Sequence, residues 1–302
     1  MKTKKRKNKY TFIDLFAGIG GFHYAFHNLG AKCVFASEWD DHARKTYEHN
    51  FREIQPELFE EGLFSKGKSL FAGDITKVNK KSIPDFDILT GGFPCQPFSQ
   101  AGFKKGFSDT RGTLFYDIAE IIKVKKPKAF FLENVRHLYN HDNGKTFETI
   151  KNILTEELGY SLHHNIVKAS EHGLPQNRPR LFMIGFRKKK IPFDFPDKKP
   201  LEFTMSDVFD GAKVNREIGF TLRVGGKGSK ITDRRNWDSY LVNNKVRRIT
   251  PKEGKKMQGF PDDFEFPVSD SQAMKQLGNS VAIYAIQDYA EKLIEALDNH
   301  YE

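Results

Sequence analysis

Cys95 is the residue best suited to nucleophilic chemistry in this chain of 302 residues. It follows an apolar strand-like run at 86–90 and lies in Gly91-Gly92-Phe93-Pro94-Cys95-Gln96-Pro97, whose glycines and prolines predict an irregular loop. In open α/β sheets, ligands bind where the strands end. Cys33, by contrast, lies within an apolar strand-like run, as a small buried apolar residue does. The sequence therefore predicts a reactive thiolate at 95 and an inert thiol at 33.

A glycine-rich turn at 14–21 (Asp-Leu-Phe-Ala-Gly-Ile-Gly-Gly) follows a strand-like run and opens a helical pattern. Glycines let the main chain approach a ligand closely. Glu38 lies 20 residues after Gly18, at the end of the next strand-like run, where an acid can accept hydrogen bonds from ribose hydroxyls. The GxGxxG spacing fails, because His23 occupies the last glycine position. The pattern favours a nucleoside cofactor without a pyrophosphate over NAD.

Strand-like runs and helical patterns alternate between Tyr10 and Phe186. Strands are predicted at 11–16, 33–36, 69–72, 86–90, 129–132 and 181–186, and helices at 22–29, 114–125, 146–158 and 271–297. This alternation predicts an α/β fold, with a doubly wound, mainly parallel sheet covered by helices on both faces. Asp74 follows the third strand, where it either faces a ligand or caps a turn.

The charge of the chain is unevenly distributed. It carries 49 Lys and Arg against 39 Asp and Glu, a formal net charge of +10. Six positive charges and no acid fall within residues 1–10, which fit either a solvated tail or a contact with a polyanion. Residues 187–248 hold sixteen positive charges and eight acids, interspersed with glycines and Trp237. Such a mixture suits a loop-rich surface that follows a phosphate backbone, and it predicts a nucleic-acid partner.

Composition excludes several classes of protein. No apolar run approaches the roughly 18 residues of a membrane helix, and the basic N-terminus has no apolar segment typical of a secretory signal. Two cysteines exclude a disulfide scaffold and an all-Cys zinc site, so no metal site is predicted and a cytoplasmic location is expected. A cysteine protease is disfavoured, because no histidine lies in a recognisable partner motif.

Residues 92–99 (Gly-Phe-Pro-Cys-Gln-Pro-Phe-Ser) resemble the catalytic motif of the bacterial DNA cytosine-5 methyltransferases of restriction–modification systems. Further motifs follow in that family's order, at 14–21, 133–135, 176–180, 248–260 and 276–281. Each motif alone is moderately specific, whereas the ordered set is highly specific and covers most of the chain. The resemblance implies an S-adenosylmethionine-dependent methyltransferase with a Rossmann-like fold and a second, smaller target-recognition domain.

The resemblance also implies the chemistry. Cys95 is expected to attack carbon 6 of a cytosine, so that carbon 5 becomes nucleophilic and accepts the methyl group. Glu133 is expected to protonate or hydrogen-bond ring nitrogen 3, which requires a raised pKa. Arg178 and Arg180 share one face of an extended segment. The resemblance assigns the second to the flipped cytosine, and a structural salt bridge is the alternative for either. Because a stacked base is inaccessible, the cytosine must be flipped out of the duplex.

The resemblance further implies two sets of binding residues. Those for the cofactor are Phe16, Gly18, Ile19, Gly20, Gly21, Glu38, Trp39, Asp74, Ile75, Pro94, Leu114, Asn279, Ser280 and Val281. Trp39 is expected to stack on adenine, with a core aromatic as the alternative. The segment 96–112 resembles the closing loop of the family, with Gln96, Ser99 and Arg111 as DNA contacts.

Four parts are implied along the chain. They are a basic tail (1–10), a catalytic and cofactor-binding domain (11–187 and 275–302), a target-recognition domain (188–246) and a connecting segment (247–274). Thr221 and Leu222 resemble the pair that marks the base-reading part of such domains. Candidate groove or phosphate contacts are Thr221, Leu222, Arg223, Lys227, Lys230, Arg234, Arg235 and Asn236. The short recognition part predicts a short site, about four or five base pairs.

A DNA (cytosine-5)-methyltransferase is therefore the leading hypothesis. A tRNA cytosine-5 methyltransferase shares these motifs, but the basic, glycine-rich insert favours duplex DNA. A non-catalytic DNA-binding subunit is the alternative from another class, and the presence of Cys95, Glu133 and Arg180 argues against it. The expected partners are duplex DNA and a paired restriction endonuclease, and no binding to a membrane is expected. The protein is expected to be a monomer in the bacterial cytoplasm.

Overall fold

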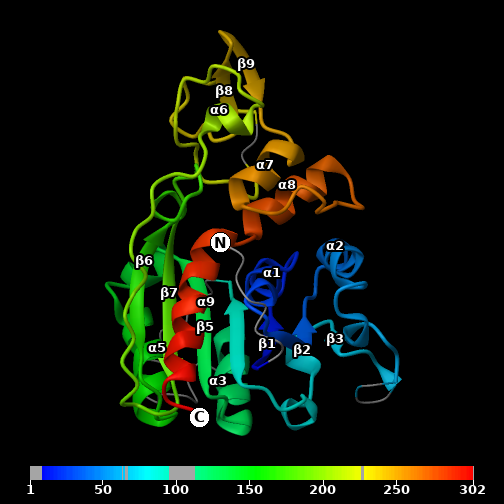
Figure 1. Cartoon of the computed structure of the whole chain (residues 1–302), viewed down its shortest axis with the longest axis vertical. Coiled ribbons are helices and arrows are strands. Elements are labelled where there is room, and N and C mark those ends of the chain that lie inside the picture. The colour runs from blue at the N-terminus through cyan, green and yellow to red at the C-terminus, as the bar shows by residue number, and fades with distance from the viewer. Residues whose placement is uncertain (1–8, 63, 65–66, 95–112, 226–227, 302) are drawn as a thin grey trace.

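A central sheet of seven strands organises the fold (Figure 1). The computed structural model describes residues 9–62, 64, 67–94, 113–225 and 228–301, so that Cys95, Gln96, Ser99, Arg111 and Lys227 lie outside the described residues. The strand order is β3-β2-β1-β4-β5-β7-β6. The strands are β1 (Thr11–Leu15), β2 (Lys32–Ser37), β3 (Phe71–Ala72), β4 (Ile88–Gly92), β5 (Ala129–Val135), β6 (His163–Lys168) and β7 (Pro179–Phe186).

The strands β1 to β5 are parallel, whereas β7 runs antiparallel to both β5 and β6. We call the end of the sheet at which the parallel strands finish the carboxyl edge, and the opposite end the amino edge. Because β7 is reversed, it begins at the carboxyl edge, where Arg180 pairs with Val135, and finishes at the amino edge, where Phe186 pairs with Ala129. The chain order reverses between β1 and β4, which makes their carboxyl ends the expected ligand site.

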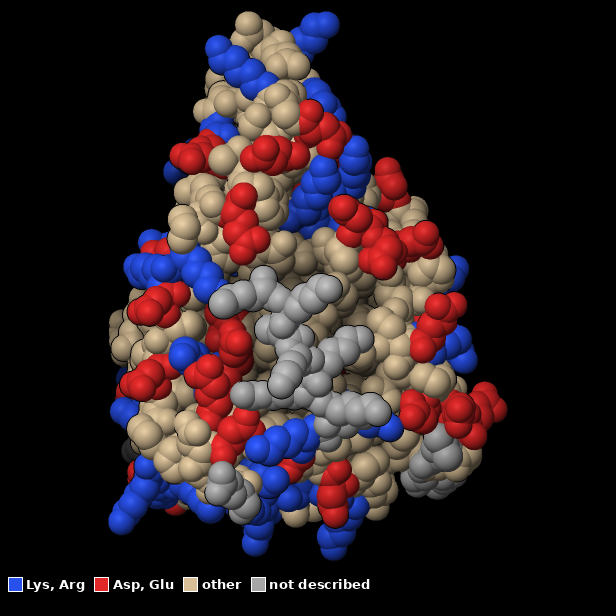
Figure 2. All heavy atoms as spheres, viewed as in Figure 1, with Lys and Arg blue, Asp and Glu red and all other residues tan. Residues whose placement is uncertain are grey.

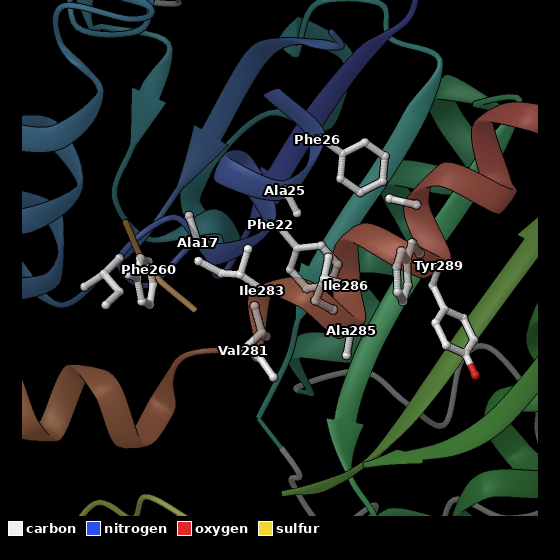
Figure 3. Packing of buried hydrophobic residues seen from close by; sticks show 14 of the residues in the cluster. Ala17, Phe22, Ala25, Phe26, Phe260, Val281, Ile283, Ala285, Ile286 and Tyr289 are labelled. Carbon is white, nitrogen blue, oxygen red and sulfur yellow. The ribbon is translucent and has the colours of Figure 1, made fainter. Parts of the chain in front are cut away.

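Helices cover both faces of the sheet, and each face has its own apolar core. One face packs against α1 (Gly21–Asn28), α2 (Asp41–Phe51) and α9 (Ile283–Asp298), and Figure 3 shows side chains of α1 meeting those of α9. The other face packs against α3 (Leu114–Lys125) and α5 (Lys145–Asn152). Continuous burial along a strand, as from Ala129 to Asn134 of β5, is what a sheet covered on both faces requires. Within the described ranges, no helix combines the length and apolar character needed to cross a membrane.

The part of the chain from 205 to 279 extends beyond the carboxyl edge (Figure 1). It contains α6 (Met205–Val208), the hairpin of β8 (Ser239–Val242) and β9 (Lys245–Arg248), α7 (Pro251–Gln258) and α8 (Asp270–Asn279). Asn243 and Asn244 both have positive φ, as the two-residue turn of a tight hairpin requires. Trp237, just before β8, and Tyr240 within it are buried, and both belong to the apolar core that includes α1 and α9.

Short elements complete the chain. They are the 3₁₀ turns at Pro56–Leu58, Ile75–Lys77, Lys80–Ser82 and Ala169–Glu171, the helical turn α4 (His137–Asn140) and a π-helical turn at Ile153–Glu157 that extends α5.

The structure confirms the predicted α/β class and each of the six predicted strands. The strands β6, β8 and β9 and the helices α2, α4, α6 and α7 were not predicted. The strand β6 has polar residues at its start, and α2 and α7 are mostly polar, so none carries a clear apolar period. The predicted helix at 271–297 is two helices, because the chain turns at Ser280–Ala282 between α8 and α9. Polar elements such as these are specified by caps and neighbours rather than by periodicity.

Candidate active site

The glycine turn forms an open cradle at the carboxyl end of β1. Gly18 and Gly20 both have positive φ, at 56° and 88°, and Gly20 N donates to Ala17 O. A Cβ added at Gly20 would lie 2.2 Å from the ring of Phe51, so only glycine fits there. A Cβ added at Gly18 would meet no atom within 4 Å. The turn is therefore packed on its helix side and open at Gly18, as a ligand cradle must be.

Glu38 lies directly beside this turn, with both carboxylate oxygens held by main-chain donors. Its Oε2 accepts from Gly18 N and its Oε1 from Asp40 N, each at 2.8 Å. Burial raises the pKa of Glu38, against the lowering effect of these N–H groups. The carboxylate thus lies at the end of β2 beside the glycine turn, where its sequence position predicts it.

The other predicted cofactor residues flank the same edge. Trp39 is 81% exposed, which no core aromatic is, and its ring is free to stack on a ligand. Asp74 accepts from the main chain and hydroxyl of Thr76, and these bonds lower its pKa. Asp74 therefore caps the turn at Ile75–Lys77 as well as facing the edge. Phe16 has a positive φ, and Leu114 is the first residue of α3. The remaining predicted residues here are buried (Ile19, Gly21 and Ile75) or exposed (Pro94).

The turn between α8 and α9 closes the cradle from another direction. Val281 packs so closely on Gly21 that a Cβ there would lie 2.5 Å from its methyl group. Ser280 Oγ is buried and has no hydrogen-bond partner among the described residues. Asn279 ends α8 beside it. An open glycine, a bound carboxylate, an exposed indole and an unpaired hydroxyl together fit a nucleoside cofactor with polar substituents.

Arg44 of α2 is a site residue that the sequence reasoning missed. Its NH1 donates to Glu38 O and to Ala72 O, and its NH2 donates to Phe71 O. The guanidinium also lies 4.3 Å from the ring centroid of Phe71. It therefore fixes the ends of β2 and β3 relative to each other. No sequence signal indicates this role, because the three acceptors are main-chain carbonyls.

Glu133 lies at the carboxyl end of β5, where it pairs in register with Gly92 of β4. Its side chain is buried, and its Oε1 forms a 2.9 Å ion pair with Nε of Arg180. Its Oε2 faces Gly92, since a Cβ there would lie 3.4 Å from it. Burial raises the pKa of Glu133, while Arg180 and Arg178 oppose that rise. The carboxyl group is thus set beside the strand end that leads to Cys95.

Asn134 holds the start of the segment that leads to Cys95. It is buried, and its Nδ2 donates to Phe93 O at 2.8 Å, while its own Oδ1 accepts from Val135 N. The sequence reasoning included Asn134 in a motif but gave it no function. The geometry shows that it ties β5 to the residue two positions before Cys95.

Arg178 is buried, like Glu133, but its guanidinium donates to main-chain carbonyls of other segments. Its NH1 donates to Leu222 O at 3.2 Å, and its NH2 donates to Gly278 O at 3.1 Å and to Ser280 O. Burial lowers the pKa of Arg178 well below its ordinary value, and Arg180 adds to this effect. Its guanidinium connects the start of β7, the Thr221–Leu222 pair and the turn before α9.

The predicted DNA contacts divide into exposed and buried residues. The exposed residues are Arg223, Lys230, Arg234 and Arg235. Of these, Arg235 donates from its Nε and its NH2 to the carboxylate of Asp233. Leu222 and Asn236 are buried, and the Asn236 side chain is used in bonds to the main chain of Ser239. The hydroxyl of Thr221 donates to Asn177 O. The exposed set can reach a ligand, whereas Leu222 and Asn236 shape the chain.

Known proteins resemble this chain over most of its length. A family model described as C-5 cytosine-specific DNA methylase matches residues 10–221 and 212–295. The Type II methyltransferase M.SsoII of Shigella sonnei is 44% identical, covering 96% of this chain and 82% of its own. M.HpaII of Haemophilus parainfluenzae is 42% identical (98% and 92%) and M.HhaI of Haemophilus parahaemolyticus is 40% identical (95% and 95%).

Solved structures share the fold. The Entamoeba histolytica methyltransferase EhMeth superposes with a TM-score of 0.71 at 20% identity, covering 98% of this chain and all of its own. DNMT2 of Spodoptera frugiperda gives 0.70 at 18% identity, covering 95% of this chain. At such identities the likeness concerns the fold alone. The family match and the identities of 40–44% decide the rest: the chain belongs to the C-5 cytosine-specific DNA methylases, enzymes that transfer the methyl group of S-adenosylmethionine to carbon 5 of cytosine in DNA.

Proposed function

We propose that Cys95, Glu133 and Arg180 form the catalytic centre of this DNA (cytosine-5)-methyltransferase. The observation that carries the assignment is the buried Glu133–Arg180 ion pair at the carboxyl end of β5, in register with Gly92. Cys95 follows Gly92 by three residues, and the assignment of the nucleophile rests on its sequence motif. No other carboxylate in the described ranges has this relation to the end of β4.

In the proposed reaction the thiolate of Cys95 forms a bond to carbon 6 of the cytosine. The electron pair of the 5,6 double bond moves into the ring, and Glu133 donates a proton or a hydrogen bond to nitrogen 3. Carbon 5 then takes the methyl group, whose donor, S-adenosylmethionine, supplies it as an electrophilic sulfonium substituent. A base removes the proton from carbon 5, the 5,6 double bond re-forms, the thiolate leaves carbon 6, and any proton on nitrogen 3 returns to Glu133.

Arg180 has two tasks in this proposal. Its Nε holds Oε1 of Glu133, which leaves Oε2 directed toward Gly92 and the cytosine side. Its positive charge also limits how far burial raises the pKa of Glu133. The raised pKa favours the protonated carboxyl group, which can donate to nitrogen 3. A cytosine reaches this depth only when it is flipped out of the duplex.

Cofactor binding is assigned to the cradle at the carboxyl ends of β1, β2 and β3. Glu38 is expected to accept hydrogen bonds from the ribose hydroxyls, Trp39 to stack on the adenine, and Ser280 to bond a polar group of the amino-acid portion. Gly18 leaves the space that the ligand occupies. The fit rests on the buried carboxylate, the unpaired Ser280 hydroxyl and the exposed indole.

Target recognition is assigned to the part of the chain at 188–246, with 247–274 as its connection to the body. Arg223, Lys230 and Arg234, the exposed cations of this part, are the proposed contacts to DNA. Most such contacts go to phosphates, which fix register rather than sequence. We place Arg178 among the positioning residues, because its donors are occupied by Leu222, Gly278 and Ser280.

The wider setting follows from the relatives, which are named Type II methyltransferases. The proposed substrate is a short duplex site, and the proposed partner is a restriction endonuclease that cuts the same site when it is unmethylated. We place the protein, as a monomer, in the reducing cytoplasm, where the free thiol of Cys33 is stable. Sedimentation of the purified protein tests the monomer.

Bisulfite sequencing of DNA from cells expressing the protein tests the activity and reads out the target. Methylcytosine is expected at a single short sequence motif, and DNA carrying it is expected to resist an endonuclease of that specificity. The Cys95→Ser variant is expected to lose methylation, by at least about a thousand-fold, while it still binds the site. Full methylation by Cys95→Ser contradicts the assigned nucleophile. The Cys33→Ser variant is the matched control and is expected to stay active.

A further inference from the structure

Four consecutive cations, Arg187–Lys190, lie at the amino edge of the sheet. The chain leaves β7 beside the start of β5, because β7 runs antiparallel. NH1 of Arg187 donates to Lys126 O, and Nζ of Lys188 donates to His300 O, each at 2.7 Å. These four cations belong to the basic stretch that the sequence assigns to DNA recognition. The structure instead places them at the opposite end of β7 from Arg180.

Further cations surround them. Nζ of Lys188 lies 4.2 Å from the ring centroid of Tyr301, and Lys128 lies 5.6 Å from the same ring and 5.4 Å from that of Tyr10. We call the whole group the amino-edge cluster: Lys9, Lys123, Lys125, Lys126, Lys128, Arg187, Lys188, Lys189 and Lys190. Figure 2 shows Lys and Arg gathered along the end of the molecule where Figure 1 places the C-terminus.

Much of this charge is not neutralised. Three of the cations pair with aspartates, Lys9 with Asp298, Lys125 with Asp85 and Lys128 with Asp87. Among the residues that the structure describes, no carboxylate forms an ion pair with Lys126 or with any of Arg187–Lys190. Two acids, Glu156 and Glu157, border the cluster near Thr155. The surface keeps a net positive charge.

Several of these charges are also held in place. Besides Arg187 and Lys188, Lys189 donates to Thr155 O at 3.2 Å. Each of these three side chains donates to a main-chain carbonyl. A carbonyl is a neutral acceptor, so the contact holds the side chain without compensating its positive charge. Arg187, Lys188 and Lys189 are thus held on neutral acceptors, without an ion pair among the described residues, and such fixed positive charge is the electrostatic footprint of a polyanion site.

We propose that the amino-edge cluster binds a second segment of duplex DNA while the target site is bound at the carboxyl edge. Eight of its nine cations are lysines, which contact phosphates as point charges and do not read bases as arginine forks do. Tyr10 is buried and Tyr301 is covered by Lys188, so among the described residues of the cluster no aromatic ring is free to stack on unpaired bases. Duplex DNA, bound without regard to sequence, is the polyanion that fits.

One duplex does not serve both sites. From Arg180 to Phe186, β7 advances by six residues, about 20 Å, across the full height of the sheet. The two sites therefore face opposite ways, and the cluster takes a separate segment. Contact with that segment keeps the enzyme on long DNA between turnovers. This inference rests on the DNA substrate of the family and not on the proposed catalytic residues.

The test compares two triple variants. Lys188→Gln/Lys189→Gln/Lys190→Gln removes exposed charge from the cluster, and Lys45→Gln/Lys168→Gln/Lys198→Gln removes the same charge from exposed lysines elsewhere. Each protein is saturated with an unlabelled target duplex. A fluorescent 12-base-pair duplex of A·T pairs, which contains no cytosine, is then titrated and followed by anisotropy at several salt concentrations. Methylation of the target duplex and thermal unfolding are measured in parallel.

The wild-type complex and the control variant are expected to bind the A·T duplex alike. The cluster variant is expected to bind it about ten-fold more weakly, with a slope of log Kobs against log salt reduced by about 2 to 3. All three proteins are expected to methylate the short target equally. Equal binding by the cluster and control variants overturns the proposal, as does a wild-type complex that binds no second duplex. So does a surface that binds polyglutamate at the same salt but not the duplex, which indicates an acidic protein partner.

Discussion

Nε of Arg180 lies 2.9 Å from Oε1 of Glu133, and both side chains are largely buried. The pair joins β7 to β5 at the carboxyl edge, where the two strands are antiparallel neighbours. Because the ion pair occupies one carboxylate oxygen, the other is left for the substrate. The contact thus orients the carboxyl group of Glu133, whose pKa is raised by burial.

Replacing Glu133 by Gln tests this arrangement. The variant is expected to lose about 100- to 1,000-fold in kcat, because glutamine cannot give a proton to nitrogen 3. The pKa of Glu133 is raised, so the folded protein holds the proton above the ordinary range, and activity that needs the proton falls as pH rises through that pKa. This alkaline decline is expected in the wild type and absent from Glu133→Gln in pH–rate profiles. A decline of equal size in both proteins contradicts the acid role.

Arg178→Lys distinguishes a positioning residue from a catalytic one. Lysine cannot reach the three carbonyls that the buried guanidinium serves, and unsatisfied buried groups cost about 2 to 3 kcal/mol of unfolding free energy. The melting temperature is expected to fall by several degrees, with a raised KM for DNA and a kcat within about three-fold of the wild type. Arg216→Lys, an exposed change in the same part of the chain, is the control. A normal melting temperature with a lost kcat contradicts the positioning role.

Arg44→Gln tests whether the guanidinium on α2 shapes the cofactor site. Without it, the ends of β2 and β3 lose their shared donor, and Glu38 and Trp39 are less well placed. The KM for S-adenosylmethionine is expected to rise about ten-fold with kcat little changed. Binding of S-adenosylhomocysteine, followed by the fluorescence of exposed Trp39, is expected to weaken equally. Arg52→Gln, an exposed change at the end of the same helix, should bind normally; a loss as large as that of Arg44→Gln contradicts the prediction.

His23 predicts an acid limit to stability. It is buried against Phe51, with Nδ1 2.6 Å from the Tyr47 hydroxyl, and burial, aided by His27, lowers its pKa to about 3. The unfolded chain binds this proton near pH 6.5 and the folded chain does not. Stability is therefore full above pH 6.5 and falls toward pH 3, by up to about 1.4 kcal/mol per unit.

Urea unfolding at pH 7.5 and pH 5 measures this effect. His23→Gln is expected to be less stable at pH 7.5 but to lose less stability than the wild type on acidification. His49→Gln, which changes an exposed histidine, is expected to follow the wild type. Parallel pH dependences for the wild type and His23→Gln contradict the prediction.

The sequence was sufficient for six of the seven strands of the sheet, because those strands are largely apolar on both faces, as Ile88 and Phe131 illustrate. It was also sufficient to indicate where Glu38 and Trp39 lie, since the end of a parallel strand determines the edge. The helix α2 was not predictable from periodicity, because its buried face is only Ala43, Thr46, Tyr47 and Phe51 among charged neighbours.

Side-chain contacts to the main chain were the second feature that could not be predicted from the sequence. Arg44, Arg178 and Asn134 act on carbonyl oxygens, and every residue type supplies such an acceptor. The location of Arg187–Lys190 depended on the reversed direction of β7, which the apolar run at 181–186 does not encode. The direction of a strand in the sheet and the carbonyls that a side chain binds can be seen only in the three-dimensional structure.

The register of Gly92 with Glu133 has a consequence for how such a chain can diverge. The acid and the approach to the nucleophile are spaced by the main-chain ladder between β4 and β5, not by the shapes of the side chains beneath them. Apolar residues under the sheet can therefore be exchanged over generations, with cost to stability before cost to the reaction. Related chains can thus differ in their core residues while the ends of β4 and β5 stay the same.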